Sequence, residues 1–479
     1  MKKIFIPLMT IAVVVSMILT GCMPKAAAPA PTPAPTPAPT PAPTPAAPTG
    51  EPIKIGMPLP LGGVSAASGV EMKEGGLLAV ETLNANGGVL GRPVEAIVFD
   101  VVDWAAEDEI AARDYLLAQG VVSFHPCWAP DPVVMDIFCA EETGGLPYYH
   151  MPTIEVCSTT WASDPDKYWN MLQIDDTAVT YGPYLYRMMA KVLPEVYEYP
   201  RKTVAVLASN LTYDQEIAAG FRKCVEADPE WEIVVDETHP YGNIEWGVQL
   251  AKIREADPGF IFCVFEPDVE AISFVRQFLE DPTQSLIVIQ CAWAPVEFRT
   301  ELGDQSIGVM GHGIVQPNPS REYREFREAY NERWGRFPGK GNPNFMWDSV
   351  MMWAEAVEAV GDETDYRGIM DYIMTHPYKG LCYGPEGTNF SPLSGTDRMM
   401  WFEGMPEFDR ETRATSLAAG STYHLIQVKE TSWGLECVVL YIHGIPADEY
   451  MQEYYGYPPA DDAIEEVGCG FELPPWIEK

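Results

Sequence analysis

Positively charged side chains are scarce in this chain. Its 479 residues include 31 Lys and Arg against 69 Asp and Glu, which gives a formal net charge of −38 at pH 7. Binding to nucleic acid needs clustered Lys and Arg to neutralise phosphates, so this balance excludes a nucleic-acid-binding protein. The same excess of negative charge disfavours direct attraction to an anionic lipid surface.

The usual motifs of metal, nucleotide and catalytic sites are also missing. The ten cysteines and seven histidines form no CxxC, no HExxH and no zinc-type spacing, so no metal ion is expected. Gly62-Gly63 and Gly87-Gly88 are predicted turns, because no GxGxxG or P-loop pattern surrounds them. No Gly-x-Ser-x-Gly elbow occurs either. We therefore predict no cofactor and no enzymatic activity.

Long apolar runs are absent except at the N-terminus. Lys2 and Lys3 precede an apolar segment from Ile4 to Leu19, which is shorter than the ~20 residues that span a bilayer. The segment ends in Leu19-Thr20-Gly21-Cys22, which resembles the bacterial lipobox. That resemblance implies that residues 1–22 are a lipoprotein signal peptide and that Cys22 is lipidated. The alternative is an ordinary signal peptide with an incidental cysteine.

Residues 23–50 form a predicted tether. They are mostly Ala, Pro and Thr with a repeated Ala-Pro-Thr-Pro unit, and they contain too little apolar surface for a core. Proline restricts its own φ and the conformation of the preceding residue, so the segment is expected to be extended. Attached to Cys22, it would hold a folded domain away from a bacterial membrane, in the periplasm or on the outer face of the cell.

The cysteines leave the redox chemistry open. Without Cys22 an odd number remains, so at least one thiol is unpaired within the monomer. Cys127 with Cys139, or Cys263 with Cys291, could form a disulfide in an oxidising compartment. Free buried thiols are the alternative.

Beyond the tether, the pattern alternates between strands and helices. The length exceeds what one hydrophobic core usually holds, so two lobes are expected. Apolar strands without polar alternation predict parallel sheets covered on both faces, in an α/β fold. The predicted strands of the first series are 53–57, 94–99, 121–124 and 148–151, with helices at 71–84, 107–119 and 133–142. Those of the second are 203–208, 232–236, 260–265 and 286–290, with helices at 213–227, 248–256 and 271–279.

Several motifs carry a family resemblance. The segment Asn84-Ala85-Asn86-Gly87-Gly88-Val89-Leu90-Gly91-Arg92, the strand from Ile53, Leu211-Thr212-Tyr213-Asp214 and Trp347-Asp348-Ser349 occur in the order found in the branched-chain amino-acid-type periplasmic binding proteins. The sequence resembles this family over roughly residues 52–440. The later helix from Phe345 to Gly361 fits it as well.

The resemblance implies the type 1 periplasmic binding protein fold. Two Rossmann-like lobes with parallel sheets would be joined by three hinge crossovers and would close on a small ligand for delivery to ABC permease subunits. The expected parts are 51–175 and 304–425 for the first lobe and 176–303 for the second. Residues 426–479 are expected to return to the second lobe and to include a C-terminal extension.

The resemblance also places candidate ligand-binding residues. Loops after the first-lobe strands carry Trp128, Ala129 and Glu155, and Tyr213 stands at the family's ligand-packing tyrosine. Phe265, Glu266 and Trp293 follow strands of the second lobe. Trp faces attract ammonium groups by ~0.5 to 2 kcal/mol, and aromatic rings also stack on flat ligands. With Glu155, this set favours an amine, amide or aromatic solute over a plain anion.

Each of these residues also has a purely structural interpretation. Trp128 and Trp293 could be core residues, Glu155 a solvated acid, and Glu266 a cap on the helix after Pro267. For the whole protein, the predicted function is capture of a small organic solute, such as an amino acid, for an ABC transporter. The alternatives are a ligand sensor of the same fold coupled to a signalling receptor, and an extracytoplasmic enzyme, for which no motif is present.

Overall fold

The computed structural model describes residues 46–63, 66–102, 105–125, 131–151, 154–164, 166–174, 178–313, 318–339, 342–383 and 423–478. The predicted signal peptide with Cys22, most of the tether, and the candidate site residues Trp128 and Ala129 lie outside these ranges. Among the residues that are described, no helix is both long and apolar enough to cross a membrane.

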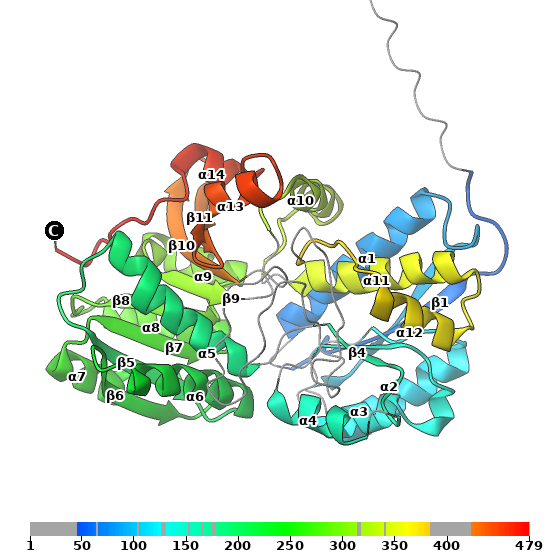
Figure 1. The fold of residues 1–479 in the computed structure, drawn as a ribbon, viewed down its shortest axis with the longest axis horizontal. Helices are drawn as coiled ribbons and strands as arrows, with labels where there is room; N and C mark the ends of the chain where they lie inside the picture. The colour runs from blue at the N-terminus through cyan, green and yellow to red at the C-terminus, as the bar shows by residue number, and fades with distance from the viewer. Residues whose placement is uncertain are drawn as a thin grey trace, which may run out of the picture. The chain divides into compact units, whose positions relative to one another are not determined.

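The first lobe is built on a parallel sheet (Figure 1). Strand β1 (Ile53–Leu59) pairs with β2 (Val94–Asp100), and β3 (Tyr148–His150) pairs with β4 (Met171–Gln173). Phe124 forms parallel bridges to both Gly56 and Tyr148, and so joins the two pairs. The strand predicted at 121–124 therefore contributes to the sheet through this bridging residue.

Helices cover both faces of this sheet. Two separate hydrophobic clusters result, one beneath α1 and α11 and the other beneath α2, α3 and α4. The helices of the lobe are α1 (Ala66–Ala85), α2 (Ala106–Gln119), α3 (Pro132–Phe138), α4 (Glu155–Ser163), α10 (Arg321–Trp334), α11 (Asn342–Val360) and α12 (Tyr366–Thr375), with a short 3-10 turn at Glu141–Thr143.

The Asn84–Arg92 motif has a direct structural role in this lobe. The Asn84 side chain donates to the Val94 carbonyl at 2.9 Å and accepts from the Val94 N–H at 2.7 Å, so it fixes the end of α1 to the start of β2. Between them Gly88 has φ +78°, and a Cβ there would lie 2.0 Å from the Arg92 carbonyl oxygen. Only glycine fits this turn, because it tolerates both the left-handed conformation and the close backbone.

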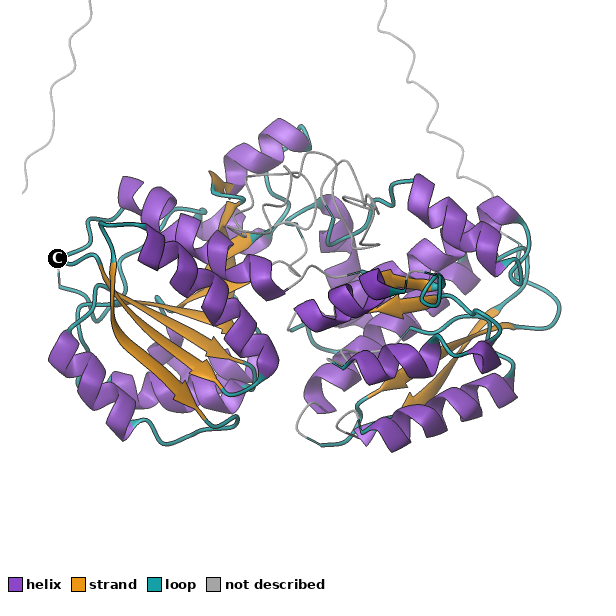
Figure 2. Ribbon diagram, turned by 60° about the horizontal axis from the view of Figure 1, so that its bottom comes forward, coloured by secondary structure: helices purple, strands orange, loops and turns teal. Residues whose placement is uncertain are grey.

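The second lobe contains a larger, mixed sheet (Figure 2). Its strand order is β12-β11-β10-β9-β8-β7-β5-β6, parallel from β6 to β9 and antiparallel from β9 to β12. Every residue of β7 is buried, as expected for a strand covered on both faces. The strands are β5 (Thr203–Ser209), β6 (Glu232–His239), β7 (Phe260–Phe265), β8 (Leu286–Cys291), β9 (Met310–Gly313), β10 (His424–Thr431), β11 (Gly434–Ile442) and β12 (Ile445–Pro446).

The helices of this lobe pack on one continuous core. They are α5 (Ala178–Arg187), α6 (Thr212–Ala227), α7 (Gly247–Ala256), α8 (Asp268–Phe278), α9 (Val296–Leu302), α13 (Ala447–Tyr454) and α14 (Asp462–Val467), with short helical turns at Met188–Val192, Leu193–Glu195 and Gly303–Ser306. Because β9 pairs with β8, the second lobe continues to Gly313, ten residues past the crossover expected at 303. The described cysteines are free, so Cys263 and Cys291 form no disulfide.

Candidate functional site

Tyr213 lies where the two lobes meet. It is the second residue of α6, in the second lobe, and its half-buried ring packs both on that lobe's core and on the first-lobe cluster that contains Ile154 and Cys157. Tyr181 of α5 meets this ring edge-on, with centroids 6.0 Å apart. The candidate site is therefore the junction between α6 and the start of α4.

The loop before Tyr213 is held by local hydrogen bonds. The Ser209 hydroxyl donates to the buried Asp214 carboxylate at 2.5 Å and accepts from the Leu211 N–H at 3.1 Å. The Gln215 amide donates to the Ser209 carbonyl. These bonds tie the end of β5 to the first turn of α6, so the Tyr213 backbone is fixed by the Leu211–Asp214 motif that marked the family resemblance.

Cys291 faces Tyr213 from the end of β8. Its sulfur lies 3.5 Å from the Tyr213 hydroxyl and accepts a hydrogen bond from the Gln290 amide at 3.0 Å. Cys291 has φ +57°, a left-handed conformation that is uncommon for residues other than glycine. Such backbone conformations are frequent at functional sites, where the surrounding structure maintains them.

Glu155 connects the two lobes through its backbone. It is the first residue of α4, and its N–H donates to the Glu216 carboxylate of α6 at 2.8 Å. Glu216 lies three residues after Tyr213, so both side chains share one face of α6. A carboxylate at a helix N-terminus is stabilised by the unpaired N–H groups and by the helix dipole.

The charges around Tyr213 are negative. Burial, followed by the proximity of Cys291, Tyr181 and Glu266, raises the pKa of the Tyr213 hydroxyl well above its usual value, so the phenol is neutral at physiological pH. Glu266, at the end of β7, is half-buried. Its influence on Tyr213 brings it to the same junction as Glu155 and Glu216.

Two other predicted residues lie in the core. Phe265 is fully buried against Trp246 and Phe274. Trp293 is 3% exposed, and its indole covers β9 so closely that a Cβ on Gly311 would be 2.3 Å from the ring. The predicted set is thus divided. Glu155, Tyr213 and Glu266 lie at the junction of the lobes, Phe265 packs inside the second lobe, and Trp293 packs there at the wall of a separate cavity. Their roles in ligand binding remain predictions.

The sequence analysis did not single out Glu216 or Tyr181 as site residues, and in the 290–293 loop it named Trp293 and not Cys291. Glu216 had one available signal, its i, i+3 spacing from Tyr213 on a predicted helix. Tyr181 had none, because the helix that carries it was not predicted. No group of three or more His, Cys, Asp or Glu with metal-site geometry occurs in the part of the chain that the structure describes.

Comparisons with known proteins agree with this geometry. Residues 52–400 match the model of the Periplasmic binding protein family. A leucine-, isoleucine-, valine-, threonine- and alanine-binding protein of Pseudomonas aeruginosa is 26% identical over 213 residues, which cover 44% of this chain and 52% of that relative. The match therefore spans about half the length of this curated relative.

Solved structures show the same fold. A putative branched-chain amino acid ABC transporter protein from Silicibacter pomeroyi superimposes with a TM-score of 0.72 at 22% identity, covering 89% of this chain and all of that one. A branched-chain amino acid transporter substrate-binding protein from Streptococcus pneumoniae, in complex with isoleucine, gives 0.61 at 18% identity, with 81% and 100% covered. A solute-binding protein from R. palustris in complex with benzoate gives 0.62 at 16% identity, with 88% and 99% covered.

The two α/β lobes with a site at their junction define a type 1 periplasmic binding protein fold. With the family match over most of its folded part, the chain belongs to the Periplasmic binding protein family. The resemblance to the branched-chain amino-acid-type members is confirmed. Membership also confirms that the chain is a binding protein rather than an enzyme, and it implies a location outside the cytoplasm.

Proposed function

We propose that this protein is a solute-binding lipoprotein that captures a small organic molecule between its lobes and delivers it to an ABC permease. The observation that carries the proposal is the position of Tyr213, whose ring touches the cores of both lobes. A side chain in that position changes its contacts when the lobes open, and a ligand packed on it would bind the closed form more tightly. The relatives named above support this function: one is an amino acid-binding protein, and two are solute- or substrate-binding proteins in complex with isoleucine and with benzoate.

The charge of the junction favours a particular ligand class. Glu266 acts on the neutral Tyr213 phenol, and Glu155 and Glu216 lie at the same junction, where the Glu216 carboxylate occupies an N–H of α4 that would otherwise be free for an anion. In a closed cleft, low dielectric strengthens both attraction to a cation and repulsion of an anion. The proposed ligand is therefore an amine- or amide-bearing, partly apolar solute, such as an amino acid whose ammonium group is held by an acidic side chain.

The proposed membrane attachment is a lipid on Cys22. The lipobox-like Leu19–Cys22 and the proline-rich residues 23–50 support it, since a strongly acidic domain has little attraction for anionic lipids. The tether would leave the lobes free to open, close and reach the permease.

A thermal-shift screen tests the ligand class. The panel contains amino acids, amides, quaternary amines, aromatic acids and simple dicarboxylates, because a ligand that binds only the folded state raises the melting temperature. We expect amine- or amide-bearing compounds to give the largest shifts. Calorimetry on Glu155→Gln should then show about tenfold weaker binding of the best compound. Tight binding of a dicarboxylate, unchanged in Glu155→Gln, would contradict the proposed charge of the site.

A further inference from the structure

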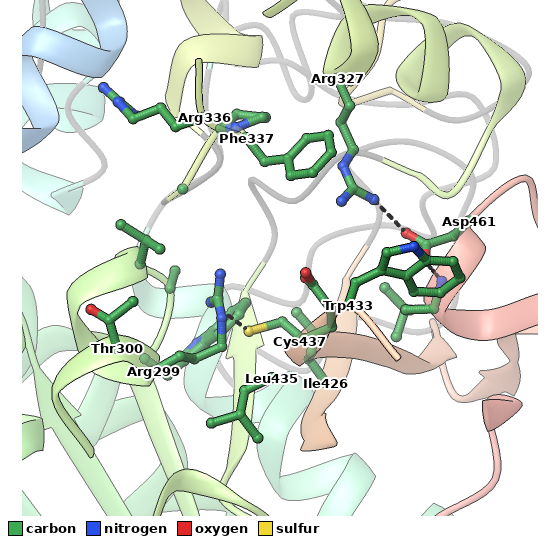
Figure 3. A pocket seen from close by; sticks show the side chains of 18 of the residues that line it. Arg299, Thr300, Arg327, Arg336, Phe337, Ile426, Trp433, Leu435, Cys437 and Asp461 are labelled. Carbon is green, nitrogen blue, oxygen red and sulfur yellow. Dashed lines mark hydrogen bonds and ion pairs between the residues drawn. The ribbon is translucent and has the colours of Figure 1, made fainter. Parts of the chain in front are cut away.

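A cavity lies away from Tyr213, between α9, the β10–β11 hairpin and α10 (Figure 3). Its volume is about 530 Å³, which falls in the range of small-molecule sites. Arg299 of α9 and Cys437 of β11 form one side, and Arg327 of α10 with Phe337 forms the other. Figure 3 shows these side chains, together with Trp433 of the hairpin turn, around one central space.

Arg299 is a cation that forms no direct ion pair among the described residues, although the nearby Glu436 carboxyl group acts on its charge. Its Nη1 donates to the Cys437 sulfur at 2.9 Å, and its buried Nε has no partner among the described residues. Its hydrogen-bond partner is a poor one. Burial raises the pKa of the Cys437 thiol, so the sulfur is neutral and a weak acceptor. A half-buried guanidinium with one such bond has unused N–H donors. An anion would stabilise it most, because it accepts charge-assisted hydrogen bonds from these donors.

The other charges at the cavity are already balanced. Arg327 pairs with Asp461 at 3.2 Å. Arg336 turns away from the cavity to Glu71 and Glu74 of α1. Glu436 lines the cavity as well, so two acids there disfavour a ligand with more than one negative charge.

The aromatic walls complement the cation. Trp433 and Phe337 are 59% and 46% exposed, although large aromatic side chains are usually buried. The hairpin turn beside Trp433 is anchored, because Ser432 donates two hydrogen bonds of 2.7 Å to Glu466 of α14. Phe337 is covered on one side by the Arg327 guanidinium, 4.8 Å from the ring centroid. Both rings are exposed and therefore available for stacking.

We propose that this cavity is a second ligand-binding site, distinct from the junction at Tyr213, for a small monocarboxylate with an aromatic or bulky apolar body. The carboxylate accepts hydrogen bonds from the terminal nitrogens of Arg299, and the body packs against Trp433 and Phe337. Arg299 and Trp433 belong to the second lobe, whereas α10 and the segment to Gly339 are attached to the first lobe through Tyr330 and Glu71. A ligand in this cavity thus contacts both lobes, so its binding is coupled to their relative position.

Calorimetry with the mature protein tests the proposal. The probes are 3-phenylpropionate, phenylacetate and indole-3-acetate, and 3-phenylpropionamide is the neutral counterpart. We expect at least one acid to bind and the amide to bind about tenfold more weakly, because it lacks the charge. Arg299→Gln and Trp433→Ala should each weaken the acid severalfold or more. Arg222→Gln, at an exposed ion pair with Asp236, is the matched charge control and should bind like the wild type.

The variants also locate the ligand. Because Trp433 is exposed, Trp433→Ala should keep the wild-type melting temperature even if Arg299→Gln does not. Tyr213→Ala should leave binding of the acid in place, since that residue belongs to the other site. Failure of all three acids to bind at millimolar concentration overturns the proposal. So does binding that survives Trp433→Ala unchanged, or that is lost in Tyr213→Ala alone, which would place the acid at the junction of the lobes.

Discussion

The backbone N–H of Glu155 in one lobe donates a 2.8 Å hydrogen bond to the carboxylate of Glu216 in the other. This bond holds the start of α4 against the N-terminal part of α6, three residues after Tyr213. Because it joins the two lobes, we expect it to stabilise the arrangement in which they lie together over a more open one. Bonds to a charged group are worth about 1.5 to 3 kcal/mol when well formed.

Removing this carboxylate should shift the protein toward an open form. We expect Glu216→Ala to have a larger radius of gyration by X-ray scattering than the wild type, both free and with ligand, because the closed form loses a bond across the lobes. Glu226→Ala, at an exposed position near the end of the same helix, is the control. Identical scattering profiles for Glu216→Ala and the wild type would show that this bond does not influence closure.

Tyr213 is expected to act through its ring. Tyr213→Ala should weaken binding of the best ligand from the screen about tenfold or more, since packing against both lobes is lost. Tyr213→Phe should bind nearly as well as the wild type, because the hydroxyl contacts only a sulfur among the hydrogen-bond partners described for it. Calorimetry measures both affinities. A large loss in Tyr213→Phe would instead assign a direct polar role to the hydroxyl.

A substitution at Trp293 tests whether this side chain stabilises the core or contacts the ligand. Trp293→Ala should lower the free energy of unfolding by about 3 to 5 kcal/mol, because the indole fills the space above Gly311. Trp433→Ala, at an exposed indole, should change it by less than about 0.5 kcal/mol. Urea denaturation compares the two. If Trp293→Ala kept full stability and lost ligand binding, the prediction that Trp293 contacts the ligand would be correct.

If Cys22 is lipidated, the protein should be found in the membrane fraction of the cells. Cys22→Ser should move the protein from membranes into soluble extracts, since one thiol would carry the whole attachment. Cys224→Ser, which replaces a thiol on α6, should stay with the membranes. Immunoblots of fractionated cells provide the measurement, and membrane retention of Cys22→Ser would contradict the anchor.

Buried histidines predict loss of stability in acid. Burial lowers the pKa of four of them from 6.5 to about 3: His125, His312, His424 and His443. The unfolded chain takes up protons at these positions below pH 6.5 and the folded chain does not. Their contribution to the free energy of unfolding is therefore complete above pH 6.5. As the pH is lowered below 6.5, this contribution decreases by up to ~1.4 kcal/mol per group and pH unit.

Buried carboxyl groups have the opposite effect. Burial raises the pKa of Glu109 to about 7 and of Glu270 to about 8, from 4.5 in both. The folded chain keeps these protons, so the stability they contribute is lost as pH rises through 7 and 8. We expect a maximum of stability near pH 6.5, seen in urea titrations at pH 5, 6.5 and 8. His376→Gln, at an exposed histidine, should leave the acid side of the curve unchanged, and a curve that is flat from pH 5 to 8 would contradict both assignments.

Much of the fold could be predicted from local patterns. The strand 260–265 is recognisable because its six residues are all apolar, and all six are buried in the structure. Asn84 with Gly87-Gly88 marks the turn that the Asn84–Val94 hydrogen bonds fix. The predicted helices are mostly found within three residues of their expected starts. In each case the residues that produce the pattern also make the contacts.

Other elements depend on contacts that no local pattern reveals. Strand β9 contains Gly311 and Gly313, which favour turns, yet it is held between β8 and β10. In β10 the buried Lys429 looks like a surface residue in the sequence, but its ammonium group donates to the Gly468 and Gly470 carbonyls of the C-terminal segment. Long-range backbone partners decide both cases.

The candidate site shows the same division. Tyr213 was predictable because the motif around it also builds its loop. In the loop after β8, the left-handed conformation of Cys291 turns the chain early, so Cys291 meets Tyr213 and the indole of Trp293 enters the core. A backbone conformation of this kind leaves no trace in residue type, because cysteine rarely adopts it.

The two edges of the eight-stranded sheet have a further consequence. One edge is β12, which has two residues and ends in Pro446, a residue without an N–H to donate. The other is β6, which exposes Glu232 and Asp236. Short, proline-bearing and charged edges prevent strands of neighbouring molecules from pairing. Copies crowded together at high local density can therefore collide repeatedly without nucleating aggregates.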